Sequence, residues 1–241
     1  MQESPDQNAR CRRALPPIAS LAVDSTHKTE TNPTYQGRVK YTPEKARAYQ
    51  VRAEGKERSE LRLVERAFQI VPQGRVLDAP CGGGRASLLL ARLGYEMTAA
   101  DLSHSMIEIT RENVATAGLK IPVEHQDLEH LTYADRHFDS ILSFRLFHHF
   151  PDAEIRQQVV RELCRVANDF VVLSYFSPWS FTSLNRKWRA ARGGRQSKKY
   201  STLLSEVESY FETCGFELVR DFGRLNWIHT LHIAVFRRIQ S

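Results

Sequence analysis

The spacing of hydrophobic positions changes near residue 75 and divides the chain into two parts. The part before it contains two predicted helices. The first starts near Thr42, which suits an N-cap because proline stands at the first helical position. The second covers about residues 57–70 and repeats its apolar residues every three or four positions. Its apolar face consists of Leu61, Val64, Ala67 and Phe68.

From residue 75 onward, short apolar runs alternate with helical patterns. The predicted strands cover residues 76–77, 97–100, 121–124, 139–144, 170–174, 216–219 and 228–237. Helices are expected to end at Gly94, Gly118 and Gly215, and to start after Ser103 or Ser105, after Asp152 and near Ser201. Ser105 and Glu108 fit a capping box.

This alternation predicts an α/β fold with a mostly parallel seven-stranded sheet and helices on both faces. The last two runs lie too close together for a crossover helix, so the last strand is expected to be antiparallel. Ligands of such sheets bind beyond the carboxyl ends of the strands.

Composition excludes few classes of protein. The chain has 241 residues, of which 41% are hydrophobic and 26% charged, and a net charge of +6. We expect a cytoplasmic location, because no apolar run reaches membrane-spanning length and the first 20 residues lack an apolar core. The positive charge permits a phosphorylated substrate, RNA or an anionic membrane. Four dispersed cysteines (Cys11, Cys81, Cys164 and Cys214) predict free thiols and no metal site.

A glycine-rich turn follows the first predicted strand, where residues 76–85 read VLDAPCGGGR. Arg85 stands where a phosphate-binding loop needs lysine, and Ser87 stands at the third glycine of the dinucleotide motif. The turn resembles instead the first motif of class I S-adenosylmethionine-dependent methyltransferases of the small-molecule type, Asp-x-Gly-x-Gly-x-Gly. Pro80 replaces the first glycine of that motif and removes one backbone N–H.

Three further segments match landmarks of the same family in the same order. MTAADLSHSM places Asp101 at the end of the second strand, and VEHQDLEHL places Asp127 just past the third. FDSILSFRLFHHF is the fourth strand with a histidine pair after it. The resemblance covers residues 42–172 well and the rest loosely. It implies a Rossmann-like fold and S-adenosyl-L-methionine as the methyl donor.

The resemblance also implies a donor site built from several loops. The glycine turn contacts the methionine and ribose portions, Asp101 accepts hydrogen bonds from both ribose hydroxyls, and Asp127 accepts one from the adenine amino group. Asp78 orients the methionine ammonium. The expected donor-binding residues are Asp78, Ala79, Pro80, Cys81, Gly82, Gly84, Arg85, Asp101, Leu102, Met106, Asp127, Leu128 and Ser143.

Structural alternatives stand beside these roles. Asp78 can simply cap the turn, Asp101 can flank a helix, and Asp127 can be an exposed loop residue. Cys81 is expected to pack rather than react, and the apolar wall residues Met106 and Leu128 can be plain core.

Methyl transfer requires an aligned acceptor and, for some acceptors, a base. His148 and His149 follow the fourth strand and are the candidate bases, with His149 ranked first. Packing before Pro151 is the alternative for both. Arg145 is expected either to bind an anionic acceptor or to pair with an acid on the surface.

Residues 177–200, the basic insert, carry seven lysines and arginines and three interleaved aromatic residues. The insert can clamp an acidic substrate, dock on anionic lipid, contact RNA, or remain a solvated loop. Besides Arg145, the candidate acceptor-binding residues are Tyr41, Trp179 and Arg186.

The sequence therefore predicts a flexible segment at residues 1–40 and a methyltransferase domain at 41–241. Within the domain, residues 41–72 form lid helices. The expected activity is methyl transfer from S-adenosylmethionine to oxygen or nitrogen of a small or lipid-linked, anionic acceptor. The alternatives are an RNA methyltransferase and a non-catalytic S-adenosylmethionine-binding module. The Asn-Pro-Pro-Tyr type of motif used on nucleobase amines is absent after the fourth strand, which disfavours that chemistry.

Overall fold

The computed structural model describes residues 54–178, 199–223 and 230–240. The helix predicted near Thr42, the flexible segment, most of the basic insert and the first residues of the last predicted strand lie outside these ranges. Tyr41, Trp179 and Arg186 lie outside them as well.

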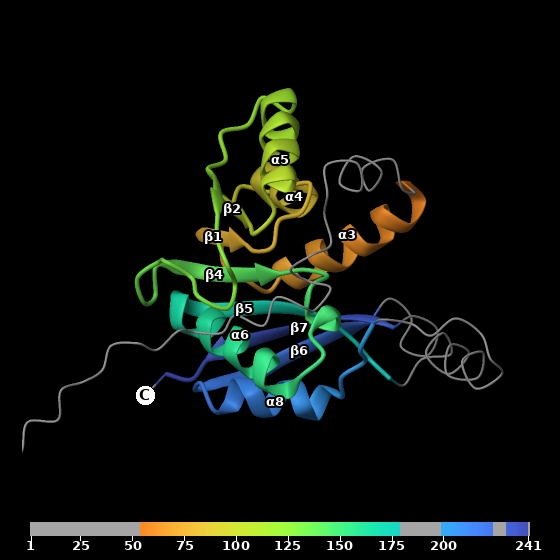
Figure 1. The fold of residues 1–241 in the computed structure, drawn as a ribbon, viewed down its shortest axis with the longest axis vertical. Coiled ribbons are helices and arrows are strands. Elements are labelled where there is room, and N and C mark those ends of the chain that lie inside the picture. Colours follow the sequence, from red (N-terminus) through yellow and green to blue (C-terminus); the bar gives the residue numbers. More distant parts are fainter. Residues whose placement is uncertain (1–53, 179–198, 224–229, 241) are drawn as a thin grey trace, which may run out of the picture. The chain divides into compact units, whose positions relative to one another are not determined.

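A seven-stranded sheet organises the described residues, with strand order β3-β2-β1-β4-β5-β7-β6 (Figure 1). The pairs among β1 to β5 are parallel, whereas β7 runs antiparallel to both of its neighbours. The predicted sheet is thereby confirmed. The strands are β1 (Arg75–Asp78), β2 (Glu96–Asp101), β3 (Val123–His125), β4 (Phe138–Ser143), β5 (Ala167–Phe176), β6 (Phe216–Gly223) and β7 (Leu231–Arg238).

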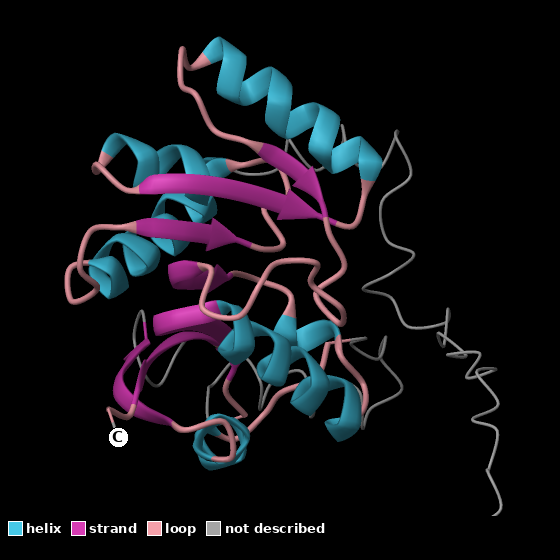
Figure 2. Ribbon diagram, turned by 90° about the vertical axis from the view of Figure 1, so that its left-hand side faces the viewer, coloured by secondary structure: helices cyan, strands magenta, loops and turns pink. Residues whose placement is uncertain are grey.

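Helices cover both faces of the sheet (Figure 2). They are α3 (Glu54–Phe68), α4 (Arg85–Arg92), α5 (His104–Thr116), α6 (Ala153–Val166) and α8 (Leu204–Glu212), with the short 3-10 helix η1 (Phe147–His149). Apolar residues of α3, α4 and α5 share one core cluster with the sheet, and those of α6 and α8 share the other. No helix in the described ranges is long and apolar enough to cross a bilayer.

The continuous apolar runs of the central strands follow from these two cores. In β5, Val171 faces the α6 and α8 cluster, whereas its neighbour Val172 faces the α3, α4 and α5 cluster. In β1, Leu77 faces the α6 and α8 cluster, and Val76 faces the α3, α4 and α5 cluster. Successive side chains of a strand point to opposite faces, so a strand covered on both faces needs apolar residues at every position.

The predicted helix starts after Ser103 and after Asp152 are confirmed, but the expected side-chain caps are not. The capping box at Ser105 is wrong, because α5 begins at His104 and Ser103 occupies the N-cap. The Asp101 carboxylate accepts the Ser103 N–H at 2.9 Å and fixes the chain just before the helix. Asp152 does hold the N-cap position of α6, but its side chain makes no capping hydrogen bond.

Candidate functional site

The turn between β1 and α4 is attached to both neighbouring strands. The N–H of Ala79 donates to the Leu142 carbonyl in β4 at 2.9 Å, and the N–H of Cys81 donates to the Ala100 carbonyl in β2 at 2.8 Å. Pro80 lies between these two anchored residues, so its missing N–H removes neither bond. The turn therefore stays attached to the sheet despite the departure from the family motif.

Helix α5 supplies the other support of the turn. The Thr110 hydroxyl donates to the Gly82 carbonyl at 2.6 Å, and the Asn113 side-chain amide donates to the Gly83 carbonyl at 2.9 Å. Sequence reasoning missed both residues. The available signal was a fully buried threonine on an otherwise apolar helix face, because a buried hydroxyl requires a partner.

Gly82 and Gly84 have positive φ angles of 54° and 76°. A side chain at Gly84 would meet Thr110 Cγ2 at 2.7 Å, whereas one at Gly82 would meet nothing within 4 Å. The backbone at Gly82 therefore borders open space that a ligand can enter, while Gly84 is needed for packing against α5.

Asp101 joins the end of β2 to the glycine turn. Its carboxylate is buried, and one oxygen accepts the Gly82 N–H at 2.9 Å. Burial raises the pKa of Asp101, and the N–H groups of Ser103 and Gly82 oppose that rise. Each carboxylate oxygen has a second acceptor direction, so the residue can also accept hydroxyls of a ligand at this turn.

Asp78 lies beneath the same turn and is 1% exposed. One carboxylate oxygen accepts the Ser87 hydroxyl at 2.6 Å, which gives the residue the structural contact expected of a capping role. The other oxygen is buried and has no hydrogen-bond partner. Burial, with a contribution from the Asp101 charge and against the Ser87 hydrogen bonds, raises the pKa of Asp78 to about 7. A buried carboxylate with an unused oxygen fits a cationic group of a ligand.

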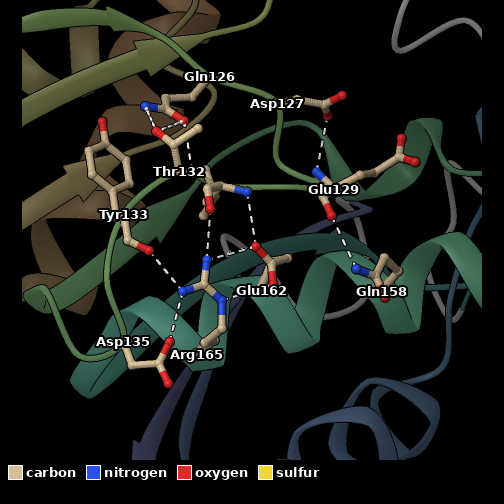
Figure 3. Close-up of polar contacts among 10 residues, drawn as sticks. Gln126, Asp127, Glu129, Thr132, Tyr133, Asp135, Gln158, Glu162 and Arg165 are labelled. Atoms are coloured by element: carbon tan, nitrogen blue, oxygen red, sulfur yellow. Dashed lines mark hydrogen bonds and ion pairs between the residues drawn. The ribbon is translucent and has the colours of Figure 1, made fainter. Parts of the chain in front are cut away.

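Asp127 lies near the same edge of the sheet. Asp101 pairs with His125 across β2 and β3, and the N–H of Gln126 donates to the Asp101 carbonyl at 3.1 Å. Asp127 follows directly and is half-buried, and its carboxylate accepts the Glu129 N–H at 3.0 Å (Figure 3). It is therefore a fixed loop residue rather than an exposed one.

The loop that carries Asp127 is held by α6 (Figure 3). The Arg165 guanidinium donates to the carbonyls of Tyr133 and Leu131, each at 2.8 Å. It also forms ion pairs with Glu162 at 2.9 Å and Asp135 at 2.8 Å. One arginine thus connects two backbone groups of the loop to two acids, a function that spacing alone did not reveal.

Four of the remaining expected donor-binding residues, Leu128, Met106, Ser143 and Cys81, are buried, whereas Leu102 is half-buried. Leu128 belongs to the core under α6, and Met106 and Ser143 are each 1% exposed. Cys81 is buried beside the Thr110 hydroxyl, and burial raises the pKa of its thiol, as expected for a packing residue. Arg85 is half-buried at the first position of α4.

The histidine pair forms most of η1, and both rings are buried. The His148 ring stacks on Phe176 with centroids 3.8 Å apart and planes 2° apart, so it packs against the end of β5. The ring centroids of His149 and His148 lie 4.2 Å apart, and the two ring planes are inclined at 41°. His149 stays the predicted base of the pair.

Arg145 binds an acid, but the pair is partly buried rather than on the surface. Its guanidinium donates to the Glu60 carboxylate of α3 at 2.8 Å, and its N–H donates to the Ser174 hydroxyl at 2.6 Å. The ion pair joins the loop after β4 to α3. Glu60 was not predicted as a site residue, because its partner is distant in the sequence.

Residues 76–169 match the family model described as a methyltransferase domain. Methyltransferase GfsG of Streptomyces halstedii is 37% identical over 117 residues, which are 47% of this chain and 41% of that protein. The ubiquinone biosynthesis O-methyltransferase of Coxiella burnetii (strain Dugway 5J108-111) is 38% identical over 87 residues, 36% of this chain and 37% of that protein.

Solved structures share the fold. The magnesium protoporphyrin IX methyltransferase of Synechocystis PCC 6803, crystallised with bound SAH, superposes with a TM-score of 0.64 at 19% identity. That superposition covers 78% of this chain and 89% of the other. Residues 76–169 therefore match a methyltransferase domain, as the resemblance implied, and the described residues have the fold of the solved methyltransferase. The chain spans about two fifths of the curated relatives that it matches, at 41% and 37% of their lengths.

The donor of this family fits the described residues. An open glycine turn, a buried carboxylate beside it and a second carboxylate with an unused oxygen suit a ribose and an ammonium group. Within the described ranges, no group of three or more His, Cys, Asp or Glu residues is arranged to hold a metal ion.

The two glycines should respond differently to alanine. Gly84→Ala should reduce the free energy of unfolding by about 2–4 kcal/mol, because it adds a clash with Thr110 to the cost of a positive φ. Gly82→Ala should cost only about 1–2 kcal/mol and should weaken donor binding instead. Urea denaturation and donor titration measure the two effects, and equal losses of stability would contradict the assigned geometry.

Donor binding should depend on the ionisation of Asp78. The free protein holds this carboxyl with a pKa of about 7, and a ligand ammonium binds its ionised form. The affinity should therefore increase roughly 10- to 30-fold from pH 5.5 to 7.5. The same raised pKa means that the folded free protein retains a proton that the unfolded chain loses, so this group's contribution to stability declines as pH rises towards 7. Asp78→Asn should make the affinity independent of pH in this window, and a flat profile for the wild type would reject the role.

Proposed function

We propose that this protein transfers a methyl group from S-adenosylmethionine to an oxygen atom of a small anionic acceptor. The proposed binding of the methyl donor rests on the hydrogen bond between Gly82 and Asp101, which places a buried carboxylate beside an open glycine turn. Asp101 would accept the ribose hydroxyls, Asp78 would pair with the methionine ammonium, and Asp127 would accept the adenine amino group. The O-methyltransferase relatives support oxygen as the acceptor atom.

The acceptor side is proposed to lie at the carboxyl end of β5. Both ends of the basic insert are attached there, because the Ser177 N–H donates to the Thr230 carbonyl and the Tyr200 N–H donates to the His148 carbonyl at 2.9 Å. The insert therefore leaves and rejoins the described structure near the histidine pair. This position supports an acceptor-binding role for the insert and for its residues Trp179 and Arg186.

A positive charge also lies at the carboxyl end of β5. The Lys199 ammonium lies 5.2 Å from the centroid of the Phe176 ring, on which His148 stacks. Arg145 is engaged with Glu60, so we assign attraction of an anionic acceptor to Lys199 and the insert rather than to Arg145. The ion pair from Arg145 to α3 supports the proposal that α3 forms part of a lid.

The chemistry requires the protein to align two reactants and remove one proton. The bound donor supplies a methyl group that is already activated by a positively charged sulfur. The acceptor hydroxyl must approach the methyl carbon opposite that sulfur, and His149 would take the hydroxyl proton as the oxygen–carbon bond forms. His148, held against Phe176, would fix the position of His149.

The acceptor class can be tested with radiolabelled S-adenosylmethionine and matched probes. The probes are 3,4-dihydroxybenzoate, its neutral analogue 3,4-dihydroxybenzamide, and bulk RNA. We expect label in the carboxylate probe, with a higher kcat/KM than for the amide. Label in RNA alone would contradict the proposal in favour of the RNA methyltransferase alternative. Donor binding without transfer to any probe or to a cell extract would favour the non-catalytic module.

His149→Ala should slow transfer by about 10²- to 10⁴-fold, the usual contribution of a general base, while donor affinity changes less than about twofold. Single-turnover kinetics measure the chemical step, and donor titration of the same sample shows that the site is intact. His148→Ala is the comparison, because it removes the Phe176 contact and is expected to lower stability as well. Equal turnover of His149→Ala and wild type would leave His149 with a packing role only.

A further inference from the structure

A second polar site lies at the opposite edge of the sheet from the glycine turn. It is a groove of about 280 Å³ lined by four arginines, two cysteines and one aspartate. Arg136 precedes β4, and Cys164 and Arg165 immediately precede β5, so the groove lies at the amino ends of these parallel strands. The donor site uses the carboxyl ends, and the two sites are therefore distinct.

The groove carries excess positive charge. Asp135 is its only acidic lining residue in the described ranges and is paired with Arg165. Arg161 is exposed and contacts the uncharged Gln158 amide at 3.4 Å. Arg238 donates to backbone carbonyls, including that of Cys164 at 2.6 Å.

Two arginines of the groove also lie close enough to repel each other. Burial lowers the pKa of Arg238, and the Arg136 charge lowers it further, against a weaker opposing effect of Asp169 and the two thiols. Arg136 adopts a positive φ of 54°. Like charges held together at a groove favour an anionic ligand between them.

Both cysteines line this charged groove. Cys214 is half-buried just after α8, whereas Cys164 is 3% exposed in the last turn of α6. The hydrogen bond from Cys164 lowers the pKa of the Cys214 thiol to about 6 against the effect of burial, with help from Thr213, Arg161 and Arg238. Burial raises the pKa of Cys164. The surroundings therefore favour ionisation of Cys214 over ionisation of Cys164.

We propose that Cys214 is a modification site for small disulfides that carry carboxylate groups. The Cys214 sulfur attacks one sulfur of the reagent, and a mixed disulfide forms as the reagent's own S–S bond breaks. The second half of the reagent leaves as a thiolate and takes a proton from water, so no further oxidant is needed. The arginines bind the carboxylates, the half-exposed thiolate attacks, and Cys164 stabilises the thiolate by hydrogen bonding.

The experiment compares glutathione disulfide, which is anionic, with cystamine, which is cationic. Both react with a thiolate by thiol–disulfide exchange. The folded full-length protein is treated with each at pH 7, and intact mass and peptide mapping follow the adduct. We expect one adduct, on Cys214, with glutathione disulfide on the order of tenfold faster than cystamine at low salt, and a smaller ratio at high salt. Cystamine as fast as glutathione disulfide, or an adduct only on another cysteine, would overturn the proposal.

Three variants separate the groove from ordinary thiol exposure. Arg161→Gln removes an exposed charge and should reduce the preference for the anionic reagent without loss of stability. The reaction rate of the wild type should rise with pH to a plateau, with a midpoint near 6. Cys164→Ala should move this midpoint upward, and Cys164→Ser, which keeps a donor, should move it less. A wild-type midpoint near that of a free cysteine, about 8.5, would also overturn the proposal.

Discussion

The hydrogen bond from the Gly82 N–H to the Asp101 carboxylate is the contact on which the candidate donor site depends. It joins the turn after β1 to the end of β2 and places a buried carboxylate beside the open backbone of Gly82. Thr110 and Asn113 hold the same turn from α5, and backbone bonds hold it to β2 and β4. The site is therefore rigid before any ligand binds, which reduces the entropy that binding must offset.

Much of the fold follows from the sequence, because periodicity reports local geometry. The runs that became β1, β2, β4 and β5 place apolar residues on both faces of the sheet, as two-sided burial requires, and Gly94, Gly118 and Gly215 follow the ends of their helices. Helix starts were less certain, because a serine at position 103 or 105 caps equally well in isolation. The tertiary contact with Asp101 decides between them.

Site residues that belong to a sequence motif were predictable, whereas residues that act through a tertiary contact were not. Asp78 and Asp101 are the last residues of β1 and β2, and Asp127 follows β3 by two residues, so each stands at a recognisable position. Glu60 and Arg165 act through partners that lie far away in the sequence or on irregular loops, and no local pattern indicates such pairs. The sequence likewise showed the charge of Arg145 but not its ion pair with Glu60.

The most direct test of the account is calorimetric titration of the protein and its Asp101→Ala variant with S-adenosylmethionine and, separately, with NAD. The account predicts micromolar binding of S-adenosylmethionine alone, weakened by about 1.5–3 kcal/mol in the variant through loss of hydrogen bonds to a charged acceptor. Equal affinity of wild type and variant, or binding of NAD instead, would contradict the assignment of this turn as the methyl-donor site.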